Sequence, residues 1–406
     1  MPRIVNPLGS SSAKICIVGE APGQEEDASG IPFVGSSGKL LNRLLRTAGI
    51  DRNECYITNV IKQRPPENDI DRLGEIGLTL DNCVKELKDE LSHNSHNIIV
   101  PLGNVALQAL TSHSSITKYR GSILHSTLIE NQKIIPTIHP AAALRQYEVT
   151  ALMVADFTKI KRESETPGFE SIPQRIFTIN PTYLNTLDEL ERLIEEPKEL
   201  SLDIETNFGA TYIKCVGLTD NPLTAFCIPF ISGKKSRWTS GEETQIWKRL
   251  KHLLNLSTNY KIIQNALFEM TVLYPWVGEI SSVYIDTMVA QNLCYPELKK
   301  DLGTITSLYT NEPFYKDDAK EGNYEDEALW NYNCKDVCVT LEAARTLNQE
   351  LEHFKMQDFF HGYIMPLQKL LFRASMKGIE SDIPLMQQYF NQVVQKYQYK
   401  SRSSSI

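Results

Sequence analysis

The sequence predicts an α/β protein with two sheet-containing regions and a short helical tail. Short β-branched runs alternate with helical segments from Lys14 onward. A polar, proline-containing stretch at 163–175, ESETPGFESIPQR, is typical of a linker. A second alternating region begins near Ile176 and passes into long helical segments. Strands that alternate with helices favour layered α/β architecture, with a parallel sheet in the first region.

The first region opens with KICIVGE, which predicts a buried strand ending in glycine. GKLLNRLLRTAGI follows with apolar residues at helical spacing and a glycine near its end. CYITNVI, NIIVPLG and KIIPTIHP are further short strand candidates, separated by helical stretches such as DNCVKELKDEL. In a three-layer fold of this kind, with helices on both faces of a parallel sheet, functional loops follow the carboxyl ends of the strands.

The second region contains strand candidates in ELSLDIET, IKCVGLT and TAFCIPF, followed by long helices. A new helical segment begins at about Phe354, and the chain ends in KSRSSSI. These patterns predict a second α/β unit followed by a helical tail.

The composition is that of a globular protein with two or three domains: 406 residues, 41% hydrophobic and 23% charged. No window approaches 18 consecutive apolar residues, and the first residues lack the apolar core of a signal peptide. The eight cysteines include no CxxC pair, which favours reduced thiols. We therefore expect a cytoplasmic protein.

The net charge argues against simple phosphate binding. Split at residue 165, the balance is 18 − 19 = −1 before and 24 − 31 = −7 after. Neither part has the basic excess of a protein that holds nucleic acid by phosphate contacts alone. The acidic part is expected to bind DNA only if its carboxylates hold divalent cations.

A set of carboxylates in the second region suits such cations. Strand periodicity places Asp203 and Glu205 on one face, and helical spacing does the same for Tyr332 and Asp336. Asn265 and Glu269 lie between them in the sequence. Two-metal hydrolysis of phosphodiesters needs three or four carboxylates around Mg²⁺ or Mn²⁺. Any single DxE motif is more often a solvated strand end, so the prediction rests on the ordered set.

That ordered set, DIET, NALFE and then YNCKD, resembles the DEDD-type 3′–5′ exonuclease domain with tyrosine in its third motif, the proofreading domain of family A DNA polymerases. The resemblance covers about 176–355 and implies a ribonuclease H-like fold with a mixed sheet. It assigns the water-positioning role to Tyr332 and substrate contact to Asn265. The metal ligands it implies are Asp203, Glu205, Glu269 and Asp336. The family usually has Asp where this chain has Glu269, which puts full activity in doubt.

The segment GYIMPLQKLLFRASMKGIESD at 362–382 resembles the start of the family A polymerase domain. Taken alone it would be a generic amphipathic helix with a glycine cap. Its place directly after the exonuclease-like region favours the polymerase interpretation. The motifs that hold nucleotide triphosphate do not occur in this chain, so it is not expected to polymerise DNA.

In the first region the informative residues fall in four loops. Glycines there allow close backbone approach to a ligand, Phe33 offers a stacking surface, and Asn59 carries one donor and one acceptor. Glu20 could orient water, and His139 could donate to a developing oxyanion. Taken separately, each loop is better explained by ordinary turns and a helix-capping histidine. The loops are GEAPGQEED (19–27), GIPFVG (30–35), YITNVIKQRPP (56–66) and IHPAAALR (138–145).

Together and in this order, the loops resemble the family 4 uracil-DNA glycosylases over about 14–160. The resemblance implies that a flipped base enters a pocket, where Phe33 stacks on it and Asn59 reads the uracil edge. His139 would stabilise the departing uracil anion, and Glu20 would position water or offset the cationic sugar. Leu144 and Arg145 would form a wedge in the minor groove. The phosphate contacts expected beside them are Lys62, Arg64 and Arg120.

Members of that family usually hold an iron–sulfur cluster on four cysteines. This chain has no CxxC before Lys14, Gln63 stands where KCRPP would supply a third cysteine, and only Cys83 has a counterpart. We therefore predict no iron–sulfur cluster. The two divalent cations of the exonuclease-like domain are the cofactors that we expect.

The whole pattern resembles the amino-terminal part of a phage-type family A DNA polymerase. The expected domains are 1–162 (glycosylase-like), 163–175 (linker), 176–355 (exonuclease) and 356–406 (truncated polymerase start). The expected function is metal-dependent 3′–5′ exonuclease action on DNA, with a first domain that excises or senses uracil. The alternative is a non-catalytic DNA-tethering part of a split polymerase. The expected partners are DNA, with a single-stranded 3′ end or uracil in a duplex, and a separate polymerase half.

Overall fold

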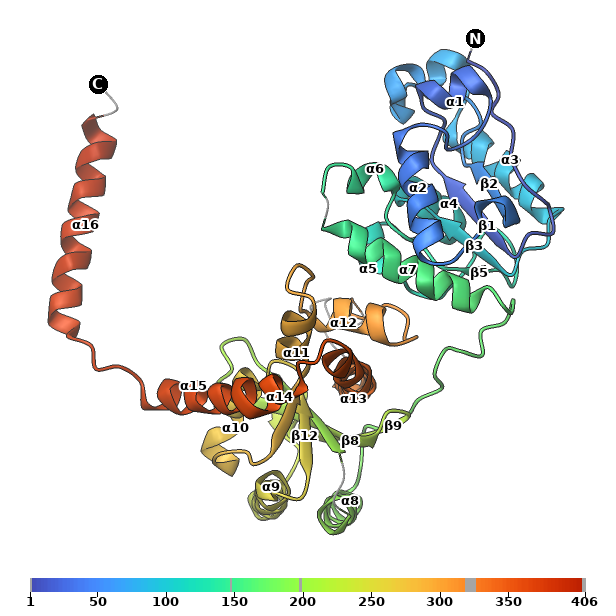
Figure 1. Cartoon of the computed structure of the whole chain (residues 1–406). Coiled ribbons are helices and arrows are strands. Elements are labelled where there is room, and N and C mark those ends of the chain that lie inside the picture. The colour runs from blue at the N-terminus through green and yellow to red at the C-terminus, as the bar shows by residue number, and fades with distance from the viewer. Residues whose placement is uncertain (1, 147, 197–198, 318–325, 404–406) are drawn as a thin grey trace.

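The computed structural model describes residues 2–146, 148–196, 199–317 and 326–403, which form two α/β units and a helical tail (Figure 1). The predicted α/β class is confirmed, with a largely parallel sheet in the first unit and a mixed sheet in the second. We call these units the first and second domains.

The first sheet has the strand order β2-β1-β3-β5-β4, and only the short pair β4 and β5 is antiparallel. Its strands are β1 (Ile15–Gly19), β2 (Cys55–Asn59), β3 (Ile98–Pro101), β4 (Leu124–His125) and β5 (Lys133–Ile134). The helices are α1 (Gln24–Ser29), α2 (Ser36–Thr47), α3 (Leu80–Ser92), α4 (Asn104–Thr111), α5 (Ile116–Tyr119), α6 (Pro140–Ala143) and α7 (Val149–Glu163). The strand expected in KIIPTIHP is therefore only two residues long.

Parallel pairing brings the predicted loops to one edge of this sheet. Gly19 and Asn59 are register partners at the ends of β1 and β2. A parallel bridge between Leu102 and Thr137 brings the chain before His139 to the same edge. Every residue of β1, β2 and β3 is buried, as expected of central parallel strands covered by helices.

The second sheet has the order β13-β12-β7-β8-β9-β6. The β7, β8 and β9 strands form an antiparallel meander, and β12 and β13 run parallel to β7, which is the predicted ribonuclease H-like arrangement. Its strands are β6 (Ile176–Thr178), β7 (Glu199–Thr206), β8 (Ile213–Asn221), β9 (Thr224–Pro229), β12 (Tyr260–Ile263) and β13 (Val283–Asp286). A small hairpin pairs β10 (Ile231–Ser232) with β11 (Lys235–Ser236).

Among the described residues, six helices accompany this sheet: α8 (Tyr183–Glu195), α9 (Ser240–Asn255), α10 (Ala266–Val277), α11 (Thr287–Cys294), α12 (Leu302–Tyr309) and α13 (Asp326–His353). The long helix α13 contacts β7, β8 and β9, while α8 and α9 pack together on the domain's other side (Figure 1). This packing lays α13 across the strand that carries Asp203 and Glu205.

Side-chain contacts hold the linker at 163–175 in place at Phe169 and Arg175. Phe169 stacks on His125 with the ring centroids 3.9 Å apart. Arg175 is almost fully buried and pairs with Glu312 at 2.8 Å and Glu342 at 2.7 Å. The segment is therefore better described as a fixed connection than as a flexible tether.

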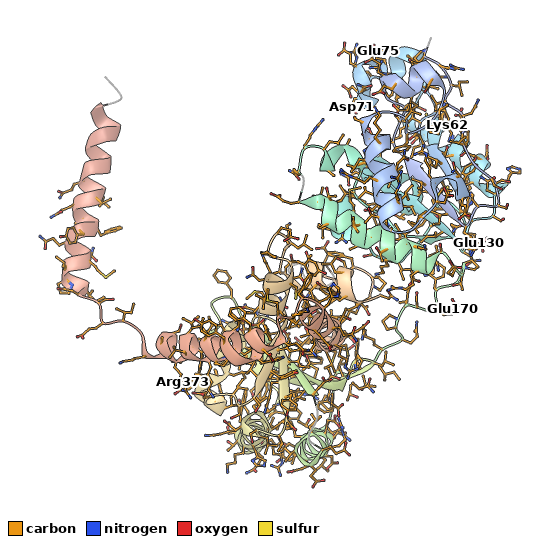
Figure 2. All side chains as sticks on the ribbon, viewed as in Figure 1. Lys62, Asp71, Glu75, Glu130, Glu170 and Arg373 are labelled. Carbon is orange, nitrogen blue, oxygen red and sulfur yellow. The ribbon has the colours of Figure 1, made fainter. Side chains whose placement is uncertain are left out.

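The tail contains α14 (Gln357–Phe359), a π-helical turn (Phe360–Ile364), α15 (Met365–Lys377) and α16 (Ile383–Ser403). α15 packs on the second domain through buried Phe372. Arg373, which lies on α15 in Figure 2, forms an ion pair with Glu279 at 2.8 Å. α16 extends away from the body (Figure 1). Within the described ranges, none of the helices has the length and apolar character needed to cross a membrane.

Candidate functional site

The first candidate site is a cavity of about 370 Å³ at the carboxyl edge of the first sheet. Four of the predicted residues line it together: Glu20, Phe33, Asn59 and His139. Leu144 and Arg145 lie outside the cavity at the end of α6, and the side chain of Leu144 is 52% exposed. Four loops far apart in sequence therefore meet in one pocket, and the last of them continues into the exposed Leu144.

Close packing at Gly19 fixes the two side chains that would face a base. A Cβ at Gly19 would lie 2.3 Å from Asn59 Oδ1 and 2.5 Å from the Phe33 ring. Phe33 has a positive φ of 54° and its ring centroid lies 5.9 Å from that of His139. A glycine at this strand end thus lets Asn59 and Phe33 approach the backbone.

Gly19→Ala is expected to destabilise the first domain by ~1–3 kcal/mol because the added methyl group overpacks this corner. Urea unfolding followed by circular dichroism, with tryptophan fluorescence reporting the second domain alone, measures this. Gly74→Ala is the matched control, since a Cβ there meets no atom within 4 Å. Equal stability of the two variants would contradict the prediction. The four tryptophans are Trp238, Trp247, Trp276 and Trp330.

His139 is held in one tautomer. It caps α6, and the Ala141 amide N–H donates to its Nδ1 at 3.2 Å. Since Nδ1 accepts, the proton of the neutral ring lies on Nε2. Burial lowers the pKa of His139 to about 4, so the ring is neutral at pH 7. The site therefore offers a neutral hydrogen-bond donor.

This lowered pKa makes the stability of the first domain depend on pH. The unfolded chain binds a proton at His139 below about pH 6.5, and the folded chain binds it only below about pH 4. The free energy of unfolding therefore falls as pH drops through this window, by ~3 kcal/mol at most. Urea unfolding at pH 7 and pH 4.5 should show a smaller loss for His139→Gln than for the parent and for His93→Gln, which changes an exposed histidine. Parallel losses in all three would contradict the assignment.

Glu26 organises the pocket loops, and the sequence analysis missed it. Its carboxylate accepts from the amides of Val34 at 2.9 Å, Gly35 at 2.8 Å and Gly23 at 3.1 Å. Glu26 stands three residues after the Gly23 N-cap, the spacing at which a glutamate accepts from the N-cap amide, and this spacing could have revealed it. The catalytic candidate in this loop is Glu20. Partial burial raises the pKa of its carboxyl group.

Two of the expected phosphate contacts are wrong. Arg120 is 4% exposed, and its guanidinium pairs with Asp156. Lys62 pairs with Glu90 at 2.5 Å and is largely buried. Both charges are neutralised inside the protein, so they stabilise the fold. Arg64, which hydrogen-bonds Asn68 at 2.8 Å, remains a predicted contact.

Cys83, the one cysteine with a counterpart in the cluster pattern, is buried on α3. Among the described residues, the group of three or more potential metal ligands that lie together consists of carboxylates and contains no cysteine. The absence of an iron–sulfur cluster stays a prediction.

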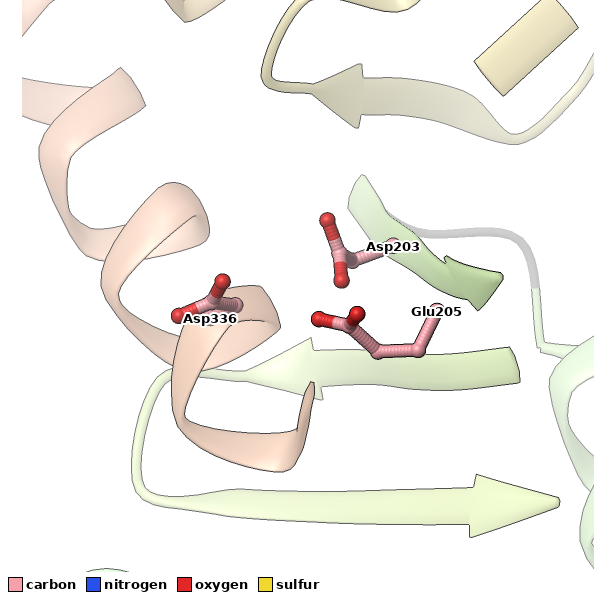
Figure 3. Close-up of side chains that lie close together, drawn as sticks. All are labelled: Asp203, Glu205 and Asp336. Atoms are coloured by element: carbon pink, nitrogen blue, oxygen red, sulfur yellow. The ribbon is translucent and has the colours of Figure 1, made fainter. Parts of the chain in front are cut away.

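The second candidate site is that carboxylate group. Asp203 and Glu205 from β7 meet Asp336 from α13, with ligand oxygens within 4.8 Å of one another (Figure 3). The period of the strand and the crossing of α13 produce the convergence. Asn333, one turn before Asp336, donates from Nδ2 to Asp203 Oδ2 at 2.7 Å and fixes that carboxylate.

The electrostatics of this group favour a cation. Burial and the neighbouring charge of Asp336 raise the pKa of Glu205 to about 7 and that of Asp203 well above its usual range. Carboxylates that repel one another in this way are stabilised by a bound divalent ion. Oxygen-only donors suit Mg²⁺ or Mn²⁺.

Glu269 lies beside this group rather than within it. The three converging carboxylates are Asp203, Glu205 and Asp336. Glu269 is buried at the start of α10, and burial together with the charge of Asp203 raises its pKa. Its Oε2 is buried without a hydrogen-bond partner. A buried carboxylate oxygen lacking a donor fits a cation as its partner, so the residues present fit a metal site.

The remaining predicted residues flank the group. The hydroxyl of Tyr332, one helical turn before Asp336, accepts from Lys316 Nζ at 2.9 Å. Asn265 caps α10 with a positive φ of 59°. Its backbone N–H donates to Asp286 Oδ1 at 3.1 Å. Asp286 also caps α11. Lys316 had no signal in the sequence, because a lysine in an irregular segment is ordinarily a surface residue.

Comparison with known proteins bears first on residues 7–162, which match the model of the uracil DNA glycosylase superfamily. A type-4 uracil-DNA glycosylase of Sulfurisphaera tokodaii is 39% identical over 166 residues, which cover 39% of this chain and 74% of that protein. This chain belongs to the uracil-DNA glycosylase superfamily. A type-4 glycosylase of Archaeoglobus fulgidus is 36% identical, with 38% of this chain and 78% of that protein covered.

A second kind of relative reaches further along the chain. The DNA polymerase of Bacillus phage SP01 is 30% identical over 230 residues, which cover 55% of this chain and 24% of that protein. Since 55% of 406 residues exceeds 162 residues, this match extends beyond the glycosylase-superfamily segment. The chain thus spans about a quarter of the length of this phage relative.

Solved structures give low TM-scores. The POL domain of Pol1 from M. smegmatis has a TM-score of 0.43 at 16% identity, covering 54% of this chain and 35% of that one. RNase D of Escherichia coli has a TM-score of 0.38 at 17% identity, covering 50% and 51%. Brucella melitensis NrnC with bound Mg²⁺ has a TM-score of 0.37 at 18% identity, covering 52% and 98%.

Proposed function

We propose that the second domain removes the 3′-terminal nucleotide of DNA by metal-dependent hydrolysis. The observation that carries this proposal is the meeting of Asp203, Glu205 and Asp336 in one oxygen-ligand group. The partnerless carboxylate oxygen of Glu269 supports a fourth ligand. The proposed limits of the exonuclease domain are 176–355.

We assign a separate role to each group of residues in the site. Asp203, Glu205, Glu269 and Asp336 would hold two divalent cations, which stabilise the attacking and leaving oxygens of a phosphodiester when bound. Tyr332 offers its hydroxyl to orient the attacking water. Asn265 lies at the amino end of α10, where it can contact the terminal nucleotide.

A 3′-labelled single-stranded DNA tests this proposal. The full chain with Mg²⁺ or Mn²⁺ should release label as mononucleotide, and EDTA should abolish the release. A 5′-labelled strand of the same sequence should shorten progressively. Release that is equal with and without EDTA would contradict the proposal.

We propose further that the first domain, 1–162, excises uracil from DNA. The pocket of Glu20, Phe33, Asn59 and His139 carries this proposal, and the type-4 glycosylases among its relatives support it. Phe33 would stack on the base and Asn59 would pair with its edge. His139 would donate from Nε2 to the developing uracil anion, and Glu20 would orient water or offset positive charge on the sugar. Leu144 and Arg145 would press into the minor groove at the pocket rim.

The competing proposal is a binding module that senses or tethers template without catalysis. A uracil-containing duplex, treated with alkali after incubation, separates the two. Strand scission supports excision. Clear DNA binding without scission favours tethering.

The helical tail suggests a partner. α16 extends from the body with exposed apolar side chains, and the phage DNA polymerase relative is about four times as long as the matched part. We propose that a polymerase part covers this helix, with 356–406 as its start and 163–175 as the connection between the first two domains. The exposed residues include Ile383, Leu385, Met386, Tyr389, Phe390 and Val393.

A further inference from the structure

The segment 307–317, which we call the strap, lies between the two domains. It begins in α12, which contacts α7 of the first domain (Figure 1). The strap contacts the first domain through polar side-chain atoms and through backbone atoms. Arg120 Nη1 donates to Ser307 Oγ at 2.9 Å, and buried Lys159 donates to the Thr310 carbonyl at 2.9 Å. Further contacts are Arg162–Asn311 at 2.7 Å, Ser122–Phe314 at 3.2 Å and Lys118–Asp317 at 2.7 Å.

Other residues of the strap face the carboxylate site. Tyr315 donates its hydroxyl to Asp336 Oδ1 at 2.6 Å. Lys316 Nζ lies 2.7 Å from Asp336 Oδ1 and 2.6 Å from Oδ2, and it also donates to the Tyr332 hydroxyl. Glu312 is anchored by Arg175 at 2.8 Å. The strap thus joins the first domain to the proposed exonuclease site.

Lys316 contacts Asp336 and Tyr332, two of the side chains that α13 contributes to that site. Its ammonium bridges the two oxygens of Asp336. A divalent cation bound to this carboxylate would therefore lie close to the positive charge of the lysine. The lysine and the divalent cation would repel each other, and this repulsion is appreciable in a half-buried site. A cavity of about 720 Å³ between the domains reaches Lys316 and Tyr332, which gives substrate a route to them.

We propose that Lys316 is a positioning residue of the exonuclease site and that the first domain holds it there through the strap. This inference rests on the metal-dependent hydrolysis proposed above. Lys316 orients Asp336 and the Tyr332 hydroxyl for reaction while it weakens the binding of divalent cations by charge repulsion. Its loss should therefore tighten cation binding and slow hydrolysis, whereas a merely structural loss would weaken both.

Calorimetric titration of the full chain with Mn²⁺ tests the role of Lys316 directly. Lys316→Met is expected to bind Mn²⁺ about tenfold more tightly than the parent and to degrade single-stranded DNA about tenfold more slowly. Lys316→Arg should keep the parent affinity because it keeps the charge. Lys248→Met removes an exposed lysine on α9 and should leave both values unchanged. Mn²⁺ binding by Lys316→Met that equals or falls below the parent's overturns the proposal. Lys316→Gln repeats the test if the methionine variant does not fold.

A second set of variants tests the contribution of the first domain. Ser122→Ala combined with Lys118→Ala removes two anchors of the strap without touching the carboxylates. Mn²⁺ affinity should rise and hydrolysis should slow, each by about two- to threefold, with unfolding by circular dichroism unchanged. Lys14→Ala breaks an exposed ion pair with Glu165 elsewhere on the first domain and serves as control. Parent values of both quantities in the anchor variant overturn the coupling.

The outcomes separate this inference from the function on which it rests. A parent chain that binds Mn²⁺ without degrading DNA contradicts the exonuclease proposal, and the Mn²⁺ affinities still decide the role of Lys316. A parent chain that binds no Mn²⁺ overturns both.

Discussion

Asp203→Ala is expected to lower metal-dependent release of the 3′-terminal nucleotide by at least ~10³-fold. The carboxylate of Asp203 converges with those of Glu205 and Asp336, and Asn333 holds it in place through a hydrogen bond from Nδ2. Alanine removes one ligand and leaves the remaining carboxylates unable to hold a cation in the same geometry. Single-turnover kinetics with 3′-labelled DNA and saturating Mn²⁺ measures the loss.

Asp188→Ala is the matched control for this prediction, because it removes an exposed aspartate from α8 of the same domain. It should degrade DNA at the parent rate. Uracil excision by both variants should equal that of the parent, since the first-domain pocket contains neither residue. Asp203→Ala with parent activity in metal would contradict the assignment of the site.

His139→Ala is expected to lower uracil excision by ~10²–10³-fold. The ring is neutral and its Nε2–H is free to donate into the cavity, because the Ala141 amide occupies Nδ1. Removal of a fixed donor at the developing anion raises the barrier to departure of uracil. Single-turnover excision from a uracil-containing duplex, followed by alkaline cleavage, measures the rate.

His93→Ala, which removes an exposed histidine at the end of α3, should excise uracil at the parent rate. Exonuclease action should be unchanged in both histidine variants. A His139→Ala protein with parent excision, or a parent without excision, would count against the catalytic proposal for the first domain.

Local periodicity explains what the sequence revealed about the candidate sites. The alternation of SLDIET placed Asp203 and Glu205 on one strand face, and four-residue spacing placed Tyr332 and Asp336 on one helix face. Both placements agree with the structure because backbone geometry alone sets these periods. The strand ends near Gly19 and Asn59 likewise placed two loops at one sheet edge.

Such patterns could not predict the contacts between segments that lie far apart in the sequence. Arg120 in its loop is indistinguishable by sequence from a surface arginine, yet it is buried against Asp156 and Ser307. Glu26 supports the pocket through three backbone amides, and only the folded loop shows them. The stretch at 163–175 was likewise predicted only as a linker, and the ion pairs of its buried Arg175 side chain became visible only in the fold.

The sequence by itself determined the two α/β regions, the four loops of the first pocket and the pairing of carboxylates within single elements. Tertiary structure alone decided that α13 crosses β7 and that Lys316 reaches Asp336 from a segment anchored on the first domain. The physical reason is the range of the interactions. Side-chain periods follow from the backbone of one element, whereas the meeting of two elements depends on how buried surfaces throughout the chain pack together.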